Sequence, residues 1–281
     1  MVQTGSGPEK TLPVVLAIVV TLAGIAAMLA SMALTAPRIA SIGIRGVLVI
    51  SEAALVVPAL LVVALRRMPL LPAFGVRPVP RSTVVLSLVL GAGLWIASLG
   101  LLELQYSVWA PPAAYLDALR HLHEMLRPQG PLDALYSLLA IAIMPALCEE
   151  ALLRGILLPS LRQRLAAALA VVLTALVFAL IHDAYRMPFT FVVGLALGAL
   201  RMRAGSLLPS LIPHATLNAL TFAAAPLLDD PSQPLPDPRP LLGLGLVVAG
   251  TIVTALAWGR LPSATARAEG TPGDRPARLR A

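Results

Sequence analysis

The residues of this chain that could do chemistry are carboxylates, imidazoles and a carboxamide inside otherwise apolar stretches. They form three groups: Glu149, Glu150 and Arg154; Phe178 and His182; and His214 and Asn218. Carboxylates and imidazoles take up and release protons, and they can also bind a transition metal. We interpret the three groups as parts of one polar site.

The spacing within the first group separates its two glutamates. Successive residues of an α-helix point about 100° apart, so we expect Glu149 and Glu150 to serve different faces. Arg154 follows Glu150 by four residues and can pair with it, in the favoured order of acid before base. Glu149 is then the carboxylate that is free to face a cavity.

The other two groups also have helical spacing. Phe178 lies one turn before His182, and His214 lies one turn before Asn218, so we expect each pair to share a helix face. Pro213 precedes His214 and leaves a backbone carbonyl without its helical donor. Inside a membrane such a carbonyl is tolerated only beside protein or water, which favours a polar, wet setting for this histidine.

The elements that must position these residues are transmembrane helices. Of the 281 residues, 58% are hydrophobic and 12% are charged, and the mean hydropathy is +0.86. A soluble domain has about a quarter of its residues charged, so a soluble enzyme is excluded. Aromatic residues make up only 4% of the chain, which favours closely packed helices over a β-barrel. The predicted fold class is an all-α, polytopic membrane helix bundle.

Eight candidate transmembrane spans can be placed, most of them near the length of about 20 residues that crosses a bilayer. They are residues 11–34, 46–65, 83–104, 131–158, 165–183, 187–202, 205–227 and 240–259. Between the third and the fourth span, residues 106–129 contain an amphipathic helix that we expect to lie in the membrane interface. We predict one membrane domain over residues 1–263, with the catalytic motifs within 131–227. Residues 264–281 are predicted to be a disordered cytoplasmic tail.

The net charge of +7 does not indicate a nucleic-acid partner, because the basic residues are spread over short loops and form no stripe with aromatic residues. Most of them fall on the side of the two termini, which predicts that both termini are cytoplasmic. The bias towards Ala, Leu, Arg and Pro suggests a bacterial protein, integral to the inner membrane and surrounded by membrane lipid. Cys148 is the only cysteine, so no internal disulfide can form.

The chain resembles the CAAX protease and bacteriocin-processing family (CPBP, or Abi) of intramembrane endopeptidases in three motifs that occur in order on separate spans. The motifs are Glu149-Glu150-x-x-x-Arg154, Phe178-x-x-x-His182 and His214-x-x-x-Asn218. The resemblance implies that Glu149 activates the hydrolytic water with His182 as its partner. It also implies that His214 and Asn218 lie beside the scissile carbonyl. The implied substrate is a membrane protein or a lipidated peptide.

Two mechanisms are open for these residues. Amide hydrolysis needs an activated water, donors to the oxyanion and a proton for the leaving amine, which a glutamate with imidazole and carboxamide neighbours can supply. Alternatively, Glu149, His182 and His214 can hold zinc with an open coordination position. The motif H-E-x-x-H is absent from the sequence, and the resemblance implies a metal-independent enzyme. We therefore expect no cofactor, with zinc as the alternative.

Two other functions would also place polar residues inside the membrane. A proton-coupled transporter would use such groups, but the sequence shows neither inverted repeats nor paired broken helices. A non-catalytic immunity or scaffold protein would tolerate the loss of Glu149 or His182, and both residues are present. These features favour the protease.

The protease interpretation meets one difficulty, which concerns depth in the membrane. On ideal helices Glu149 falls about 7 Å to the cytoplasmic side of the middle of its span, whereas His182 falls near the outer end of its own. Bringing the two together requires a tilt, a stagger or a kink. Pro145 is a candidate for the kink.

Overall fold

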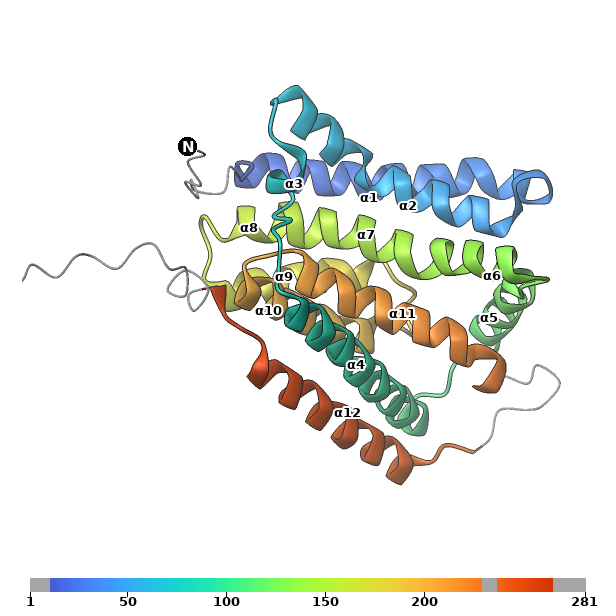
Figure 1. The fold of residues 1–281 in the computed structure, drawn as a ribbon. Helices are drawn as coiled ribbons and strands as arrows, with labels where there is room; N and C mark the ends of the chain where they lie inside the picture. The colour runs from blue at the N-terminus through green and yellow to red at the C-terminus, as the bar shows by residue number, and fades with distance from the viewer. Residues whose placement is uncertain (1–10, 229–236, 265–281) are drawn as a thin grey trace, which may run out of the picture.

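The computed structural model describes residues 11–228 and 237–264, and within these ranges it contains helices and no strand. Figure 1 shows a bundle of long helices of which several run side by side. The predicted all-α membrane helix bundle is confirmed. The tail predicted to be disordered lies outside the described residues, except for its first residue.

A helical hairpin forms the N-terminal part of the bundle. It consists of α1 (Val14–Thr35), the short turn η1 (Ala36–Arg38) and α2 (Ile39–Leu65). The two helices touch where Gly24 has no side chain, since a Cβ atom there would lie 2.3 Å from the carbonyl oxygen of Leu55. Small residues at such crossings let membrane helices approach closely.

The helix that carries the two glutamates runs from Pro131 to Leu161 and is not regular. We call it the motif helix. It comprises α6 (Pro131–Leu138), the π-helical η2 (Leu139–Ile143), α7 (Met144–Glu150), the π-helical η3 (Ala151–Leu157) and α8 (Leu158–Leu161). In Figure 1 it passes between the α1–α2 hairpin and α11. π-Helical turns are rare and occur frequently at functional sites. Here they flank Glu149 and Glu150 on both sides, and Pro145 stands between them.

Three further helices complete the surroundings of the site. They are α9 (Ala167–Leu180), α10 (Met187–Ala204) and α11 (Leu208–Leu228). The helix α9 has only 14 residues, so it is about 21 Å long. The predicted span over 165–183 is therefore too long at its end, and His182 lies in the turn that follows α9.

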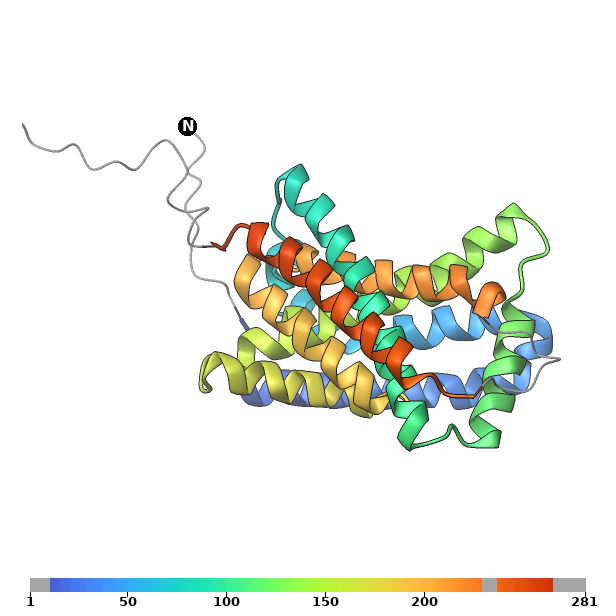
Figure 2. The same ribbon diagram turned by 90° about the horizontal axis from the view of Figure 1, so that it is seen from below.

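The helices α4 (Arg81–Val108) and α12 (Pro240–Arg260) form a pair that crosses below the rest of the bundle (Figures 1 and 2). Their contact depends on Gly250, where a Cβ atom would lie 2.4 Å from the backbone nitrogen of Ala97. The helix α4 also packs against α11, so it supports the helix that bears His214.

The connections contain two more helices. The short α3 (Leu70–Ala73) follows α2, and α5 (Ala113–Leu126) lies between α4 and α6. The amphipathic helix predicted within residues 106–129 is therefore present. Its end is held by Arg45, which donates from Nη2 to the carbonyl oxygen of Leu126 (3.1 Å) and from Nε to Oγ of Ser137 (2.7 Å).

All eight predicted apolar spans correspond to helices, with ends that differ by a few residues. Five stretches within the described ranges are long and apolar enough to cross a membrane. They are Val14–Leu65, which contains both α1 and α2, Arg81–Val108, Pro131–Leu161, Met187–Ala204 and Pro240–Arg260. The protein is an integral membrane protein. The number of eight crossings stays a prediction.

Candidate active site

Arg154 is the cation at the centre of the site, and its guanidinium group is completely buried. Nη1 donates to Oε1 of Glu150 at 2.8 Å, and Nη2 donates to the carbonyl oxygen of Gly194 at 3.1 Å. Its Cζ atom lies 4.7 Å from the centre of the Phe178 ring. The pairing of Glu150 with Arg154 predicted from their spacing is thus present. It links the motif helix to α9 and α10.

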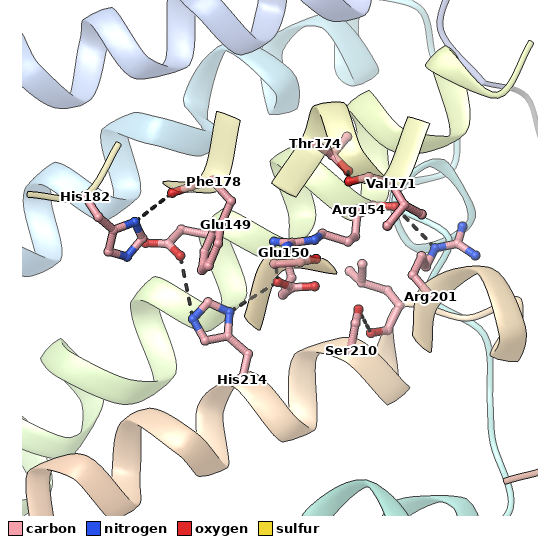
Figure 3. Close-up of polar contacts among 12 residues, drawn as sticks. Glu149, Glu150, Arg154, Val171, Thr174, Phe178, His182, Arg201, Ser210 and His214 are labelled. Carbon is pink, nitrogen blue, oxygen red and sulfur yellow. Dashed lines mark hydrogen bonds and ion pairs between the residues drawn. The ribbon is translucent and has the colours of Figure 1, made fainter. Parts of the chain in front are cut away.

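His214 of α11 lies between the two adjacent glutamates (Figure 3). Its Nδ1 is 3.2 Å from Oε1 of Glu150, and its Nε2 is 3.7 Å from Oε2 of Glu149. The two glutamates are thus linked through one residue of another helix. Their side chains leave the helix in different directions, but a single imidazole between them reaches both.

Glu149 is buried, with 6% of its surface exposed, yet its Oε2 has no hydrogen-bond partner within the part of the chain that the structure describes. No guanidinium holds it, in contrast to Glu150. A carboxylate that is shielded from bulk water and has an unused acceptor can bind a water molecule or a substrate group. By comparison, Oε1 of Glu150 is bound by Arg154 and lies beside His214, while its Oε2 also has no partner in the described part of the chain.

His182 is oriented by the last turn of α9. Its Nδ1 lies 2.7 Å from the carbonyl oxygen of Phe178, and the two rings are 4.8 Å apart between centres. Because a carbonyl oxygen only accepts hydrogen bonds, Nδ1 carries the proton, and in a neutral ring Nε2 is then an acceptor. Figure 3 shows the ring of His182 directed towards the Glu149 carboxylate.

The short α9 resolves the difficulty of depth. A helix that continued to residue 183 would carry His182 further along the bundle. Instead α9 ends at Leu180, and His182 lies in the turn that follows, where Figure 3 shows its ring beside the Glu149 carboxylate. The π-helical η2 and η3 make the motif helix irregular on both sides of the two glutamates.

Phe178 forms an apolar wall between the two histidines. Its ring lies edge-on to His214, with centres 5.5 Å apart and planes at 88°, and it also contacts His182. The ring therefore separates the buried guanidinium of Arg154 from the open side of the imidazoles.

Asn218 lies one turn after His214 on α11 and is half-buried. It makes no side-chain hydrogen bond with residues 11–228 or 237–264. Its carboxamide is therefore available to a substrate, although its role as an oxyanion donor is still a prediction.

One comparison with known families gives a match. Residues 131–220 match the family model described as Type II CAAX prenyl endopeptidase Rce1-like, and this segment contains all three motifs. This part of the chain is similar to the CAAX protease family. The match covers roughly a third of the chain, from α6 into α11. No curated protein and no solved structure matches the chain.

The match to the CAAX protease family indicates a protease. Within residues 11–228 and 237–264, no three His, Cys, Asp or Glu side chains come together in a group that could hold a metal ion. The residues Glu149, His182 and His214 are thus near one another without forming a ligand set.

One residue of the site was missed in the sequence analysis. Glu52 lies on α2, which packs against α7, and its Oε2 is buried without a hydrogen-bond partner in the described part of the chain. A single glutamate inside the apolar span 46–65 was the signal that could have revealed it, because such a residue is costly and needs a purpose. No motif contains it.

Proposed function

We propose that this protein is an intramembrane endopeptidase that hydrolyses a peptide bond with a water molecule activated by Glu149. One observation supports this most directly. Of the two adjacent buried glutamates, Glu150 is bound through Oε1 by Arg154, whereas Glu149 has no arginine partner in the described part of the chain and lies beside two imidazoles. That contrast fits one structural carboxylate and one catalytic carboxylate.

The first step is the activation of water. Glu149 accepts a proton from the water molecule while the water oxygen adds to the scissile carbonyl carbon. His182, whose Nε2 is an acceptor in the neutral ring, can accept the second water hydrogen and so aim the oxygen. The carbonyl oxygen of Phe178 holds the ring of His182 in this orientation, because it accepts a hydrogen bond from Nδ1.

The second step requires donors to the oxyanion, and the structure constrains how His214 can act. Its Nδ1 proton is directed at Glu150, so donation to an oxyanion must come from Nε2. Nε2 carries a proton at the same time as Nδ1 only in the imidazolium form. Asn218 can supply a neutral second donor.

The last step breaks the carbon–nitrogen bond. The proton that Glu149 took from water passes to the leaving amine, so the glutamate returns to its initial form. The products are a carboxylic acid and an amine, and no atom of the protein is consumed. Every group in this sequence belongs to the chain itself, which is why we propose a mechanism without a metal.

The substrate that we propose is a membrane-embedded protein or a lipid-anchored peptide. The family description names a prenyl endopeptidase, and the site lies among apolar helices that such a substrate can reach from the lipid. We further propose that the protein resides in a bacterial inner membrane with both termini in the cytoplasm, in accordance with its basic loops.

The experiment that tests the function compares the membrane proteome of cells that contain the wild-type protein with that of cells that contain Glu149→Gln. New N- and C-termini that appear only with the wild type identify substrates. A purified assay on the corresponding peptides then measures the rate. Glu149→Gln nearly conserves volume, so we expect it to insert and purify normally and to retain less than a few per cent of the activity.

The matched control is Glu103→Gln, which changes a glutamate of another apolar helix, α4. It should cleave at the wild-type rate. Activity of Glu149→Gln that equals the control would contradict the role of Glu149. A complete absence of new termini in the wild type would favour a non-catalytic function.

A further inference from the structure

Glu52 and Glu149 share an unusual feature. Each has a buried Oε2 atom without a hydrogen-bond partner within residues 11–228 and 237–264; Glu150 has such an atom as well, but its Oε1 is bound by Arg154. A buried polar atom of this kind in a folded protein calls for a specific explanation. Because Glu52 and Glu149 lie on neighbouring helices, one explanation can account for both of these Oε2 atoms.

The register of α2 against the motif helix places Glu52 at the level of Glu149. At one end of the contact, Arg45 of α2 donates a hydrogen bond to Ser137 of the motif helix. Further along, Leu55 of α2 and Leu152 of the motif helix both lie next to Gly24 of α1, so these two residues are at the same level. The two helices therefore run in the same direction.

Glu52 precedes Leu55 by about one turn, just as Cys148 precedes Leu152. This puts Glu52 opposite Cys148 and Glu149, on the face of α2 that packs against α7. The contact between α2 and α7 closes the site on the side opposite α11.

The charges of this region do not balance if every carboxyl group is ionised. The ionisable groups that act on Glu149 or lie beside it are Glu52 of α2, Cys148 and Glu150 of α7, Arg154 of η3, His214 of α11, and His182 and Arg186 between α9 and α10. Helices α1, η2 and α3, which also pack on α2, carry no ionisable residue, and α5 meets α2 at its Arg45 end.

Of the cations, Arg154 is bound to Glu150, and Arg186 is partly exposed and 3.9 Å from Asp183. Two neighbouring carboxyl groups without a dedicated cation cannot both ionise cheaply in an apolar setting. They are therefore expected to titrate as one unit.

We propose that Glu52 is a further residue of the active site, a positioning residue that acts through Glu149 by sharing one proton with it. This inference rests on the proposed function of Glu149 as the base. In the resting enzyme the pair carries one proton and one negative charge. When the proton resides on Glu52, Glu149 is the ionised partner that accepts the proton of the water.

The direct test is chemical labelling of the full-length protein in detergent with dicyclohexylcarbodiimide, which reacts with protonated carboxyl groups in apolar surroundings. Peptide mass spectrometry then measures the label on each glutamate as a function of pH. We expect label on Glu52 and Glu149 and none on Glu150, because its guanidinium partner keeps it ionised. A Glu52 that stays unlabelled at every pH would overturn the proposal.

Coupling is tested by removing one member of the pair. In Glu149→Gln the labelling of Glu52 should end at a lower pH than in the wild type, by about one pH unit or more, because the like charge is gone. In Glu52→Gln the labelling of Glu149 should move in the same direction. Glu103→Gln should move neither. Equal midpoints in the wild type and in Glu149→Gln would overturn the shared proton, even if Glu52→Gln fails to fold.

The labelling does not depend on proteolysis, so the two proposals can fail separately. Coupled labelling without any cleavage would retain the shared proton and refute the endopeptidase. With a substrate in hand, Glu52→Gln should shift the acidic limb of kcat/KM to lower pH by about one unit. A residue with a purely structural role would lower the rate equally at all pH values, and that result would overturn the proposal.

Discussion

The Nε2 atom of His214 lies 3.7 Å from Oε2 of Glu149. The mechanism that we propose gives these two residues different tasks, since Glu149 activates the water and His214 donates to the oxyanion. Their proximity implies that, in this mechanism, the attacking water and the carbonyl oxygen lie close together. The second nitrogen of the ring is held by Glu150, which prevents His214 from turning away.

Glu150 and Arg154 are expected to act mainly through stability. Both side chains are completely buried and joined at 2.8 Å. Arg154→Ala or Glu150→Gln removes one partner and leaves an uncompensated charge, which costs about 3–5 kcal/mol. Thermal unfolding in detergent should show a large loss for both variants. A variant that unfolds at the wild-type temperature but is inactive would assign the pair a direct part in the reaction.

His182 and Asn218 should differ in their effect on the rate. His182→Ala removes the group that aims the water together with Glu149, and we expect it to lose most of the activity. Asn218→Ala removes one donor to the oxyanion, which costs about 100- to 1000-fold in turnover. We expect the smaller loss for Asn218→Ala, measured as kcat on an identified peptide. The reverse order would exchange the roles of the two residues.

Metal removal separates the two mechanisms. We expect activity to survive 1,10-phenanthroline and the purified protein to contain less than one zinc per chain. If Glu149, His182 and His214 bound zinc, His182→Ala and His214→Ala would lose metal and activity together. Elemental analysis that finds about one tightly bound zinc per chain, lost in both variants, would establish a metalloprotease.

Gly194 should be sensitive to any side chain. A Cβ atom there would lie 3.1 Å from both Ala175 and Phe178, and its carbonyl oxygen accepts a hydrogen bond from Arg154. Gly194→Val should force α9 and α10 apart and destabilise the protein by about 1–3 kcal/mol. The matched control is Gly245→Val, since no atom lies within 4 Å of a Cβ there. Equal thermal stability of the two variants would show that the α9–α10 contact is not tight.

Several features could be predicted from the sequence because they depend on short-range geometry. Long apolar runs must form helices in lipid, since only a helix satisfies its own backbone within one segment. The pairing of Glu150 with Arg154 follows from the helical repeat of 3.6 residues, and the contact of Phe178 with His182 follows from the same spacing.

The rest was decided by how separate helices pack. Which ring nitrogen of His214 meets which glutamate depends on the rotation of α11 against α7. The level of His182 depends on the early end of α9, and the part of Glu52 depends on the register of α2. Neither rotation nor register leaves a periodic signal in the sequence, because both result from side-chain packing over whole helix surfaces. The sequence by itself therefore determined the helices and the chemical groups, and the tertiary structure alone decided which of those groups meet.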